Sequence, residues 1–273
     1  MKQLLKNKTG LLPWLLPLIL FGMWLGNSIV KVIPVHLLPT PLQIAESLGT
    51  YVFAEPASGP YAGRFLGDVT ASLMRIVAGF SLAAALGVPL GLWSGRVRVV
   101  EQALSPTIHA VRAVPGITWL PLALAWFGVG MKTTVFLVGL AAFFPIYLNT
   151  HTGAAAVDPQ MLRAGAMLGV KRVRGLFHIV LPAAVPHIVP GLRLGLGIAW
   201  AYLVLGELTG VPNGLGALIM DARMVGRIDM IIVGMIIISV IGKTSDSLMM
   251  IILKAAFPSV RRQTGPAEQM QQP

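Results

Sequence analysis

Hydrophobic and polar positions alternate along the chain in long blocks rather than residue by residue. Windows of about 20 mostly apolar residues recur, and a charged or Gly- and Pro-rich stretch separates each window from the next. A helix needs about 20 such residues to cross the ~30 Å hydrocarbon core of a bilayer. The pattern therefore predicts an all-α membrane protein with six transmembrane helices. We expect these helices at residues 11–30, 69–93, 103–127, 133–156, 185–208 and 230–253.

The first window has an alternative interpretation as a cleaved signal peptide. The lysines before it fit the basic start of such a peptide. The apolar stretch, however, is about twice the usual length of a signal core, and no Ala-x-Ala-like cleavage site follows before Lys31. We therefore expect a retained helix.

Composition supports a membrane protein and excludes a conventional soluble enzyme. Hydrophobic residues make up 55% of the 273 positions and charged residues only 11%, against about 25% charged in ordinary soluble proteins. The mean hydropathy is +0.77. The chain has no cysteine, which excludes disulfides, thiolate metal sites and a lipid anchor on cysteine.

The formal net charge of +11 would indicate nucleic-acid binding in a soluble chain, but here the cations follow the predicted loops. Twelve of the 21 lysines and arginines fall in alternate loops on the side of the termini, and five fall on the other side. Cytoplasmic loops carry the excess of Lys and Arg, so both termini are predicted to be cytoplasmic. The charge then marks orientation, and no nucleic-acid partner is expected.

This orientation divides the chain into a membrane domain and its inserts. The six-span domain occupies residues 11–257, after a short cytoplasmic N-terminus at 1–10. It carries an external insert at 31–68 and a cytoplasmic loop at 157–184. The polar, Gln-rich tail at 258–273 is predicted to be disordered and cytoplasmic.

The cytoplasmic loop holds the strongest local signals in the chain. Asp158 can cap free backbone N–H groups, and Pro159 suits the first position of a helix. The helix is expected to run over residues 160–168 and to end at Gly169, which tolerates a left-handed conformation. Its predicted exposed apolar side chains are Met161, Leu162, Met167 and Leu168. Two interpretations stay open from the residues alone: the helix lies on the membrane surface, or it docks onto another protein.

The spacing of residues within this loop matches a known motif. Gly169 is followed after nine positions by Ile179 and then by Leu181 and Pro182. This spacing resembles the EAA loop, Glu-Ala-Ala-x3-Gly-x9-Ile-x-Leu-Pro, of the permease subunits of binding-protein-dependent ABC importers.

The front half of the motif departs from that pattern. Ala164 matches the second position, while Arg163 replaces the Glu and Gly165 replaces the third-position Ala. The departure affects any role of the motif's acidic side chain. A helix that docks into a groove depends mainly on its apolar surface instead.

The resemblance extends over residues 38–253. Within that family, the chain is most similar to the nitrate, sulfonate and taurine branch. The stretches that carry it are residues 72–80, 87–91, 115–128, 191–193 and 214–216, with Trp200 and Glu207.

The resemblance implies half of a type I importer in a bacterial inner membrane, working by alternating access. Expected partners are a second copy of the chain, two cytoplasmic ABC ATPase subunits and an external binding protein. ATP and Mg²⁺ would bind the ATPase, so this chain is expected to bind no cofactor or metal and to be no enzyme. The implied cargo is a small oxyanion, with aliphatic sulfonate or taurine ahead of nitrate, bicarbonate or another small solute. The residues implied in ATPase coupling are Asp158, Met161, Leu162, Arg163, Ala164, Gly165, Met167, Leu168, Gly169, Ile179, Leu181 and Pro182.

An ion-coupled secondary transporter is the alternative of another class. It would need no ATPase and would usually show paired acids at the midplane, for which Lys243 and Asp246 are the one candidate. Gly242-Lys243-Thr244 does not form a P-loop, because Ile237 stands where the motif needs an earlier glycine.

Charges inside the predicted spans are costly, so their positions are informative. Lys243 and Asp246 are three residues apart, and we expect them to pair locally rather than to relay protons. Arg75 and Arg193 lie within two turns of their helix ends, and we expect them to reach lipid phosphates or water.

The third window contains a helix breaker next to a cation. Pro115 removes a helix hydrogen bond, and a broken helix with Arg112 beside it can present polar groups to an anion. The alternative is that Arg112 reaches back to the cytoplasmic surface. Glu207 precedes Pro212-Asn213-Gly214 and is expected to organise an external turn or gate. Candidates for the translocation path are Arg112, Pro115, Trp119, Arg193, Trp200 and Glu207.

Overall fold

A computed structural model describes residues 12–55, 59–170 and 172–257, and every regular element within them is helical. The predicted N-terminal segment and C-terminal tail lie outside these residues. The long elements are α2 (Leu12–Val30), α3 (Pro41–Phe53), α4 (Phe65–Arg96), α5 (Arg98–Ala113), α6 (Trp119–Phe127), α7 (Met131–Ala155), α8 (Pro159–Met167), α10 (Leu181–Glu207), α11 (Leu215–Val225) and α12 (Ile228–Ala256). The short elements are η2 (Gly116–Thr118), α9 (Arg172–Gly175) and the π-helical turn η3 (Leu176–Val180).

Within the described residues, four helical stretches are long and apolar enough to cross a membrane, or up to five if the bent pair counts as one span. The four are 65–96, 131–155, 176–207 and 228–256. The third predicted window is not one straight helix, because α5 and the helical segment from Gly116 to Phe127 are bent by 82° relative to each other. The first window forms a shorter apolar helix, whose part at Trp14–Val30 falls below a full span.

Two further helices lie in segments that the sequence analysis assigned to inserts and loops. α3 begins with a capping box: the Thr40 hydroxyl accepts from the Gln43 amide, and the Gln43 side chain accepts from the Thr40 amide. Such a pair satisfies two N–H groups that a helix start otherwise leaves free. α11 fills most of the connection between the fifth and sixth windows.

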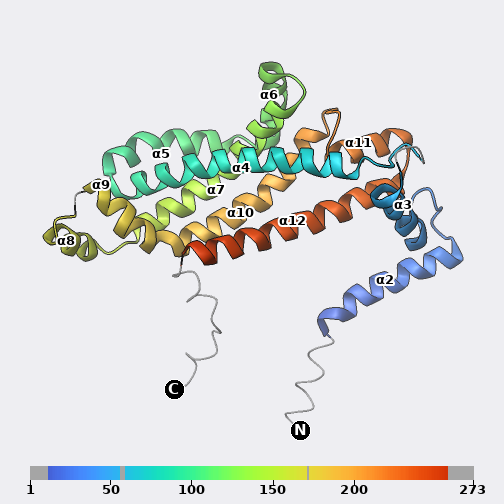
Figure 1. Cartoon of the computed structure of the whole chain (residues 1–273), viewed down its shortest axis with the longest axis horizontal. Helices are drawn as coiled ribbons and strands as arrows, with labels where there is room; N and C mark the ends of the chain where they lie inside the picture. The colour runs from blue at the N-terminus through green and yellow to red at the C-terminus, as the bar shows by residue number, and fades with distance from the viewer. Residues whose placement is uncertain (1–11, 56–58, 171, 258–273) are drawn as a thin grey trace, which may run out of the picture. The chain divides into compact units, whose positions relative to one another are not determined.

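The chain divides into two compact units. The larger unit, residues 69–217 with 238–273, is built on α7, which is apolar on all sides and buries residues along its whole length. A helix of that kind belongs in the interior of a bundle. In Figure 1, α4 and α10 run alongside α7.

Glycines allow this close packing of helices. A Cβ at Gly87 or Gly91 of α4 would press against Ile146 or Thr150 of α7, and a Cβ at Gly195 of α10 would press against the same Ile146. Small residues let helix backbones approach where no solvent drives them together.

The smaller unit, residues 1–68 with 218–237, is joined by polar contacts as well as apolar packing. The buried Tyr51 hydroxyl lies 2.9 Å from an Asp68 oxygen, and Arg64 forms an ion pair of 3.0 Å with Asp221. Burial raises the pKa of the Tyr51 phenol, so the hydroxyl stays protonated and donates a hydrogen bond to Asp68. Ser47 donates to Asp229 at 2.6 Å and ties α3 to the first turn of α12.

Candidate functional site

The break between α5 and α6 is produced by Val114 and Pro115. Val114 is extended, with φ −73° and ψ 119°, as expected for the residue before a proline. Pro115 cannot donate a backbone hydrogen bond, and its own carbonyl accepts from both the amide and the hydroxyl of Thr118, at 2.9 and 2.6 Å. The predicted broken helix is confirmed.

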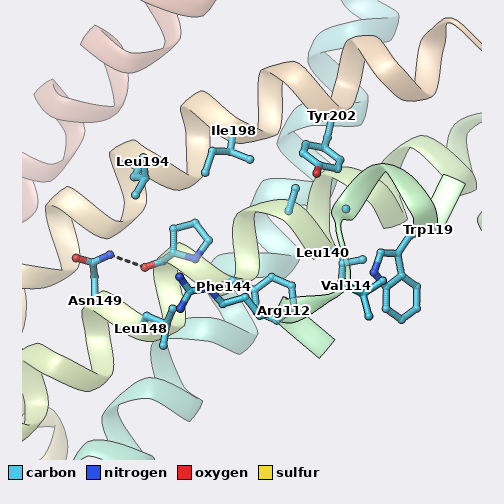
Figure 2. Close-up of a pocket in the computed structure, with 13 residues that line it drawn as sticks. Arg112, Val114, Trp119, Leu140, Phe144, Leu148, Asn149, Leu194, Ile198 and Tyr202 are labelled. Atoms are coloured by element: carbon cyan, nitrogen blue, oxygen red, sulfur yellow. Dashed lines mark hydrogen bonds between the residues drawn. The ribbon is translucent and has the colours of Figure 1, made fainter. Parts of the chain in front are cut away.

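A cavity of about 360 Å³ opens at this break, a size in the lower part of the range for small-molecule sites. Its wall comes from the end of α5, the turn η2, α6, α7 and α10 (Figure 2). The lining residues are Arg112, Val114, Gly116, Trp119, Leu140, Ala141, Phe144, Pro145, Leu148, Asn149, Leu194, Ile198 and Tyr202.

Arg112, Asn149 and Tyr202 are the polar side chains of this lining (Figure 2). Arg112 is exposed, and within the described residues no carboxylate lies at ion-pair distance from it. The Asn149 amide donates to the Pro145 carbonyl at 2.8 Å. At Gly116 a Cβ would collide with the Tyr202 hydroxyl, so the backbone of the break lies directly against that ring. The cavity therefore combines apolar walls with one cation.

Asn149 and Tyr202 did not figure among the sequence candidates, although a spacing signal was available. On α10 the lining positions Leu194, Ile198 and Tyr202 are four residues apart, and Asn149 follows Pro145 by four on α7. Positions four apart share one face of a helix. Which of several such faces borders a cavity depends on the packing of the helices.

Arg193 and Trp200 lie elsewhere on α10 and fasten that helix to α12. Two nitrogens of Arg193 donate to Asp246 at 2.9 Å each, and the Trp200 indole donates to Ser245 at 3.0 Å. Arg193 is exposed, as expected, but it also has a carboxylate partner that the sequence did not predict. Asp246 pairs mainly with Arg193, since Lys243 lies 3.9 Å away.

Arg75 does not reach lipid, because its side chain is buried against Glu207. Its Nη1 donates to Glu207 at 2.6 Å and to the Asn213 carbonyl at 2.6 Å. The Ser72 hydroxyl lies 2.7 and 2.9 Å from the two carboxylate oxygens, and the Gly216 amide donates to Glu207 at 2.8 Å. Glu207 thus holds the turn that follows α10, as the sequence predicted for an organising residue.

The loop with the EAA-like spacing folds locally as its residues predict. Asp158 caps α8 by accepting from the Gln160 amide at 2.8 Å, and Gly169 has a φ of +79°. Gly165 is buried, and a Cβ there would collide with Ile179. The two halves of the motif therefore pack against each other, and Gly at the third position makes room for Ile179.

The apolar surface of α8 is open to solvent at three of the four predicted positions. Met161 is 51% exposed, Met167 89% and Leu168 85%, while Leu162 is half-buried. Arg163 and Ala164 are also exposed, and the Leu181-Pro182 pair begins α10. Such exposed methionines suit a surface that another protein covers.

Known proteins resemble this chain over most of its length. Residues 87–262 match the family described as binding-protein-dependent transport system inner membrane component. The putative aliphatic sulfonates transport permease protein SsuC of Bacillus subtilis is 35% identical over 233 residues, which cover 85% of this chain and 82% of the relative. The taurine transport system permease protein TauC of Escherichia coli is 33% identical, with 82% and 80% covered. The nitrate import permease protein NrtB of Synechocystis is 30% identical, with 82% of each covered.

A solved structure shares the fold. The inward-facing MetNI methionine ABC transporter contains a chain that aligns with a TM-score of 0.57 at 16% identity, covering 72% of this chain and 98% of that chain. The helical architecture, the apolar helices and the family match all indicate the same kind of membrane protein. The chain belongs to the inner-membrane permease components of binding-protein-dependent ABC importers.

Proposed function

We propose that this permease carries a small organic oxyanion, an aliphatic sulfonate or taurine, through the cavity at the α5–α6 break. The observation that carries the proposal is that Arg112 is the one charged side chain among the described residues of the cavity lining. A cation with polar neighbours and apolar walls suits a sulfonate, whose charged oxygens and short apolar chain need different surroundings. Relatives that are named for sulfonates and taurine support the same cargo.

The rest of the machinery follows from the family. We infer a homodimer with two cytoplasmic ATPase subunits, which bind ATP and Mg²⁺ and contact α8, and an external binding protein that delivers cargo. The distribution of lysine and arginine supports a cytoplasmic position for both termini and α8. The exposed surface of α8 supports its role as the ATPase contact.

Uptake measurements test the cargo. The permease, its ATPase and its binding protein are expressed together in cells without their own sulfonate importers, and entry of labelled taurine, ethanesulfonate and nitrate is followed. We expect ATP-dependent uptake of a sulfonate and slower uptake of nitrate. Uptake of nitrate alone would select the nitrate alternative, and uptake that continues without the ATPase would contradict an ABC importer.

Substitutions at Arg112 test the cavity separately. Arg112→Gln removes the charge and is expected to lower sulfonate uptake about tenfold or more, since a charge-assisted contact is lost. Arg112→Lys keeps the charge and should retain part of the activity. Arg223→Gln, at an exposed arginine outside the cavity, is the matched control. Equal uptake by Arg112→Gln and the control would place the cargo elsewhere.

A further inference from the structure

A second cavity lies beside α8, between the end of α4, the start of α5 and the turn η3. Its volume is about 740 Å³, and most of its wall is apolar, with Trp93, Leu162 and Ile179 among the lining residues. Arg96, Arg98 and Arg163 lie in the same lining, and none of its described residues is an Asp or Glu. An apolar wall combined with three arginines suits a ligand that has both an anionic group and an apolar part.

The three arginines are not neutralised within the described residues. Nη1 of Arg96 donates to the carbonyls of Ala154 and Val157, at 3.3 and 3.0 Å, which supplies partial charges only. Arg98 and Arg163 are exposed, and the described residues offer neither of them a carboxylate at ion-pair distance. Arg163 stands where the EAA pattern has Glu, so this chain has a positive charge where the pattern provides a negative one.

The position of the cavity along the helices indicates the kind of anion. The long apolar helices α4 and α7 end at Arg96 and Ala155, so the cavity lies where hydrocarbon gives way to lipid headgroups. Trp93 is 50% exposed at this level, and tryptophan is enriched at membrane interfaces. Basic pockets at such positions suit anionic lipid headgroups.

We propose that this cavity binds one anionic phospholipid, with its phosphate at Arg98 and Arg163 and part of an acyl chain along the apolar wall. A free phosphate would leave that wall uncovered, whereas a phospholipid fills both halves of the site. The proposal depends on α4 and α7 being membrane helices, which the family assignment provides, and is independent of the cargo. It makes α8 a lipid-contacting element on the side that faces the cavity.

The test uses the permease purified with its ATPase subunits, stripped of lipid in a neutral detergent. Phosphatidylglycerol and phosphatidylcholine with identical acyl chains are titrated in, and bound lipid is counted by native mass spectrometry. We expect preferential binding of one phosphatidylglycerol per permease chain. The double variant Arg98→Gln/Arg163→Gln should bind phosphatidylglycerol about tenfold more weakly, with phosphatidylcholine unchanged, because two cations near the phosphate are lost.

Two further variants keep the result interpretable. Ala166→Trp fills the cavity but retains all three arginines, and it should also lower phosphatidylglycerol binding. This variant tests the site independently if the double variant fails to assemble. Arg174→Gln, at an exposed arginine outside the cavity lining, should leave binding unchanged. An equal loss with Arg174→Gln would show general surface attraction and overturn the proposal.

Two outcomes would assign the site to a different occupant. Full displacement of phosphatidylglycerol by millimolar inorganic phosphate would make it a free-anion site. Preferential lipid binding only after removal of the ATPase subunits would show that an acidic surface of the ATPase fills the cavity in the assembled importer. Either result overturns the lipid assignment.

Discussion

At the scale of single residues, Arg75 and Glu207 form a buried ion pair. Glu207 is fully buried, and its two oxygens accept from Ser72, Arg75 and the Gly216 amide. The Ser72 hydroxyl also accepts from the Leu215 amide at 2.9 Å. Three donors thus serve the two carboxylate oxygens, and a buried charge requires such hydrogen bonds. The pair connects α4 to the turn after α10.

Removing one member of this pair should be more damaging than removing both. Glu207→Ala leaves the Arg75 charge buried without a partner, and we expect a loss of about 3–5 kcal/mol in the free energy of unfolding. The double variant Arg75→Met/Glu207→Leu should recover part of that loss, because no buried charge remains. Thermal unfolding of the purified complex in detergent measures both.

An exposed ion pair provides the comparison. Arg64 and Asp221 lie 3.0 Å apart with partly exposed side chains, so Asp221→Ala should cost about 1 kcal/mol or less. If Glu207→Ala and Asp221→Ala destabilise the protein equally, the buried network does not hold the turn as described.

At the scale of helices, the contact between α7 and α10 depends on where glycine falls. A Cβ at Gly191 would lie 2.6 Å from the Asn149 Cβ and 3.1 Å from the Pro145 carbonyl, closer than atoms in a packed interior tolerate. A Cβ at Gly197, on the same helix, would meet nothing within 4 Å. Both glycines lie in the same helix, but only Gly191 is packed closely against another helix.

Alanine at these two positions should change stability in opposite directions. Gly191→Ala forces α7 and α10 apart, and we expect a loss of about 1–3 kcal/mol. Gly197→Ala removes a flexible residue from a helix without a clash and should be neutral or stabilising by up to about 1 kcal/mol. Thermal unfolding of the two variants in parallel measures the difference; a loss with Gly197→Ala as large as with Gly191→Ala would contradict this packing.

The exposed face of α8 gives a second prediction at this scale. Met167 is 89% exposed, so a charged side chain there is compatible with the fold of the permease. If α8 contacts the ATPase through its apolar surface, Met167→Glu should reduce the amount of ATPase that co-purifies at least severalfold. Met224→Glu on α11, at a methionine that is 77% exposed, is the control and should leave co-purification unchanged. If the ATPase co-purifies normally with the Met167→Glu permease, α8 does not contact the ATPase through this face.

At the scale of the whole molecule, the orientation in the membrane is open to a direct measurement. The chain has no cysteine, so one introduced cysteine gives an unambiguous signal. Phe53, 86% exposed, belongs to the insert predicted to be external, and Met167 to the loop predicted to be cytoplasmic. In cells that express the permease without its ATPase, a membrane-impermeant maleimide should label Phe53→Cys when the cells are intact and Met167→Cys only after permeabilisation. The opposite pattern would invert the topology.

Local features were predictable from the sequence because neighbouring residues produce them. Asp158 caps a helix, Gly169 ends it and Pro115 breaks another, each through the backbone geometry of a few positions. The capping box at Thr40 and Gln43 was equally local and identifies α3, although the sequence analysis had placed no helix there.

Partners distant in sequence could not be assigned in advance. Arg75 pairs with Glu207 across 132 positions and Arg193 with Asp246 across 53. Neither arginine has this carboxylate near it in the sequence, so lipid phosphate or water was the expected partner. The same holds for the cavity at the break, where Asn149 and Tyr202 join Arg112 only because α7 and α10 pack beside α5.

The sequence by itself determined that the chain is a helical membrane protein and which family it belongs to, because apolar block length and motif spacing are properties of consecutive residues. The tertiary structure decided which charges are neutralised, where the cavities lie and which side chains line them. Those outcomes depend on which helix faces meet, and many pairings of apolar faces are compatible with the same hydrophobic pattern.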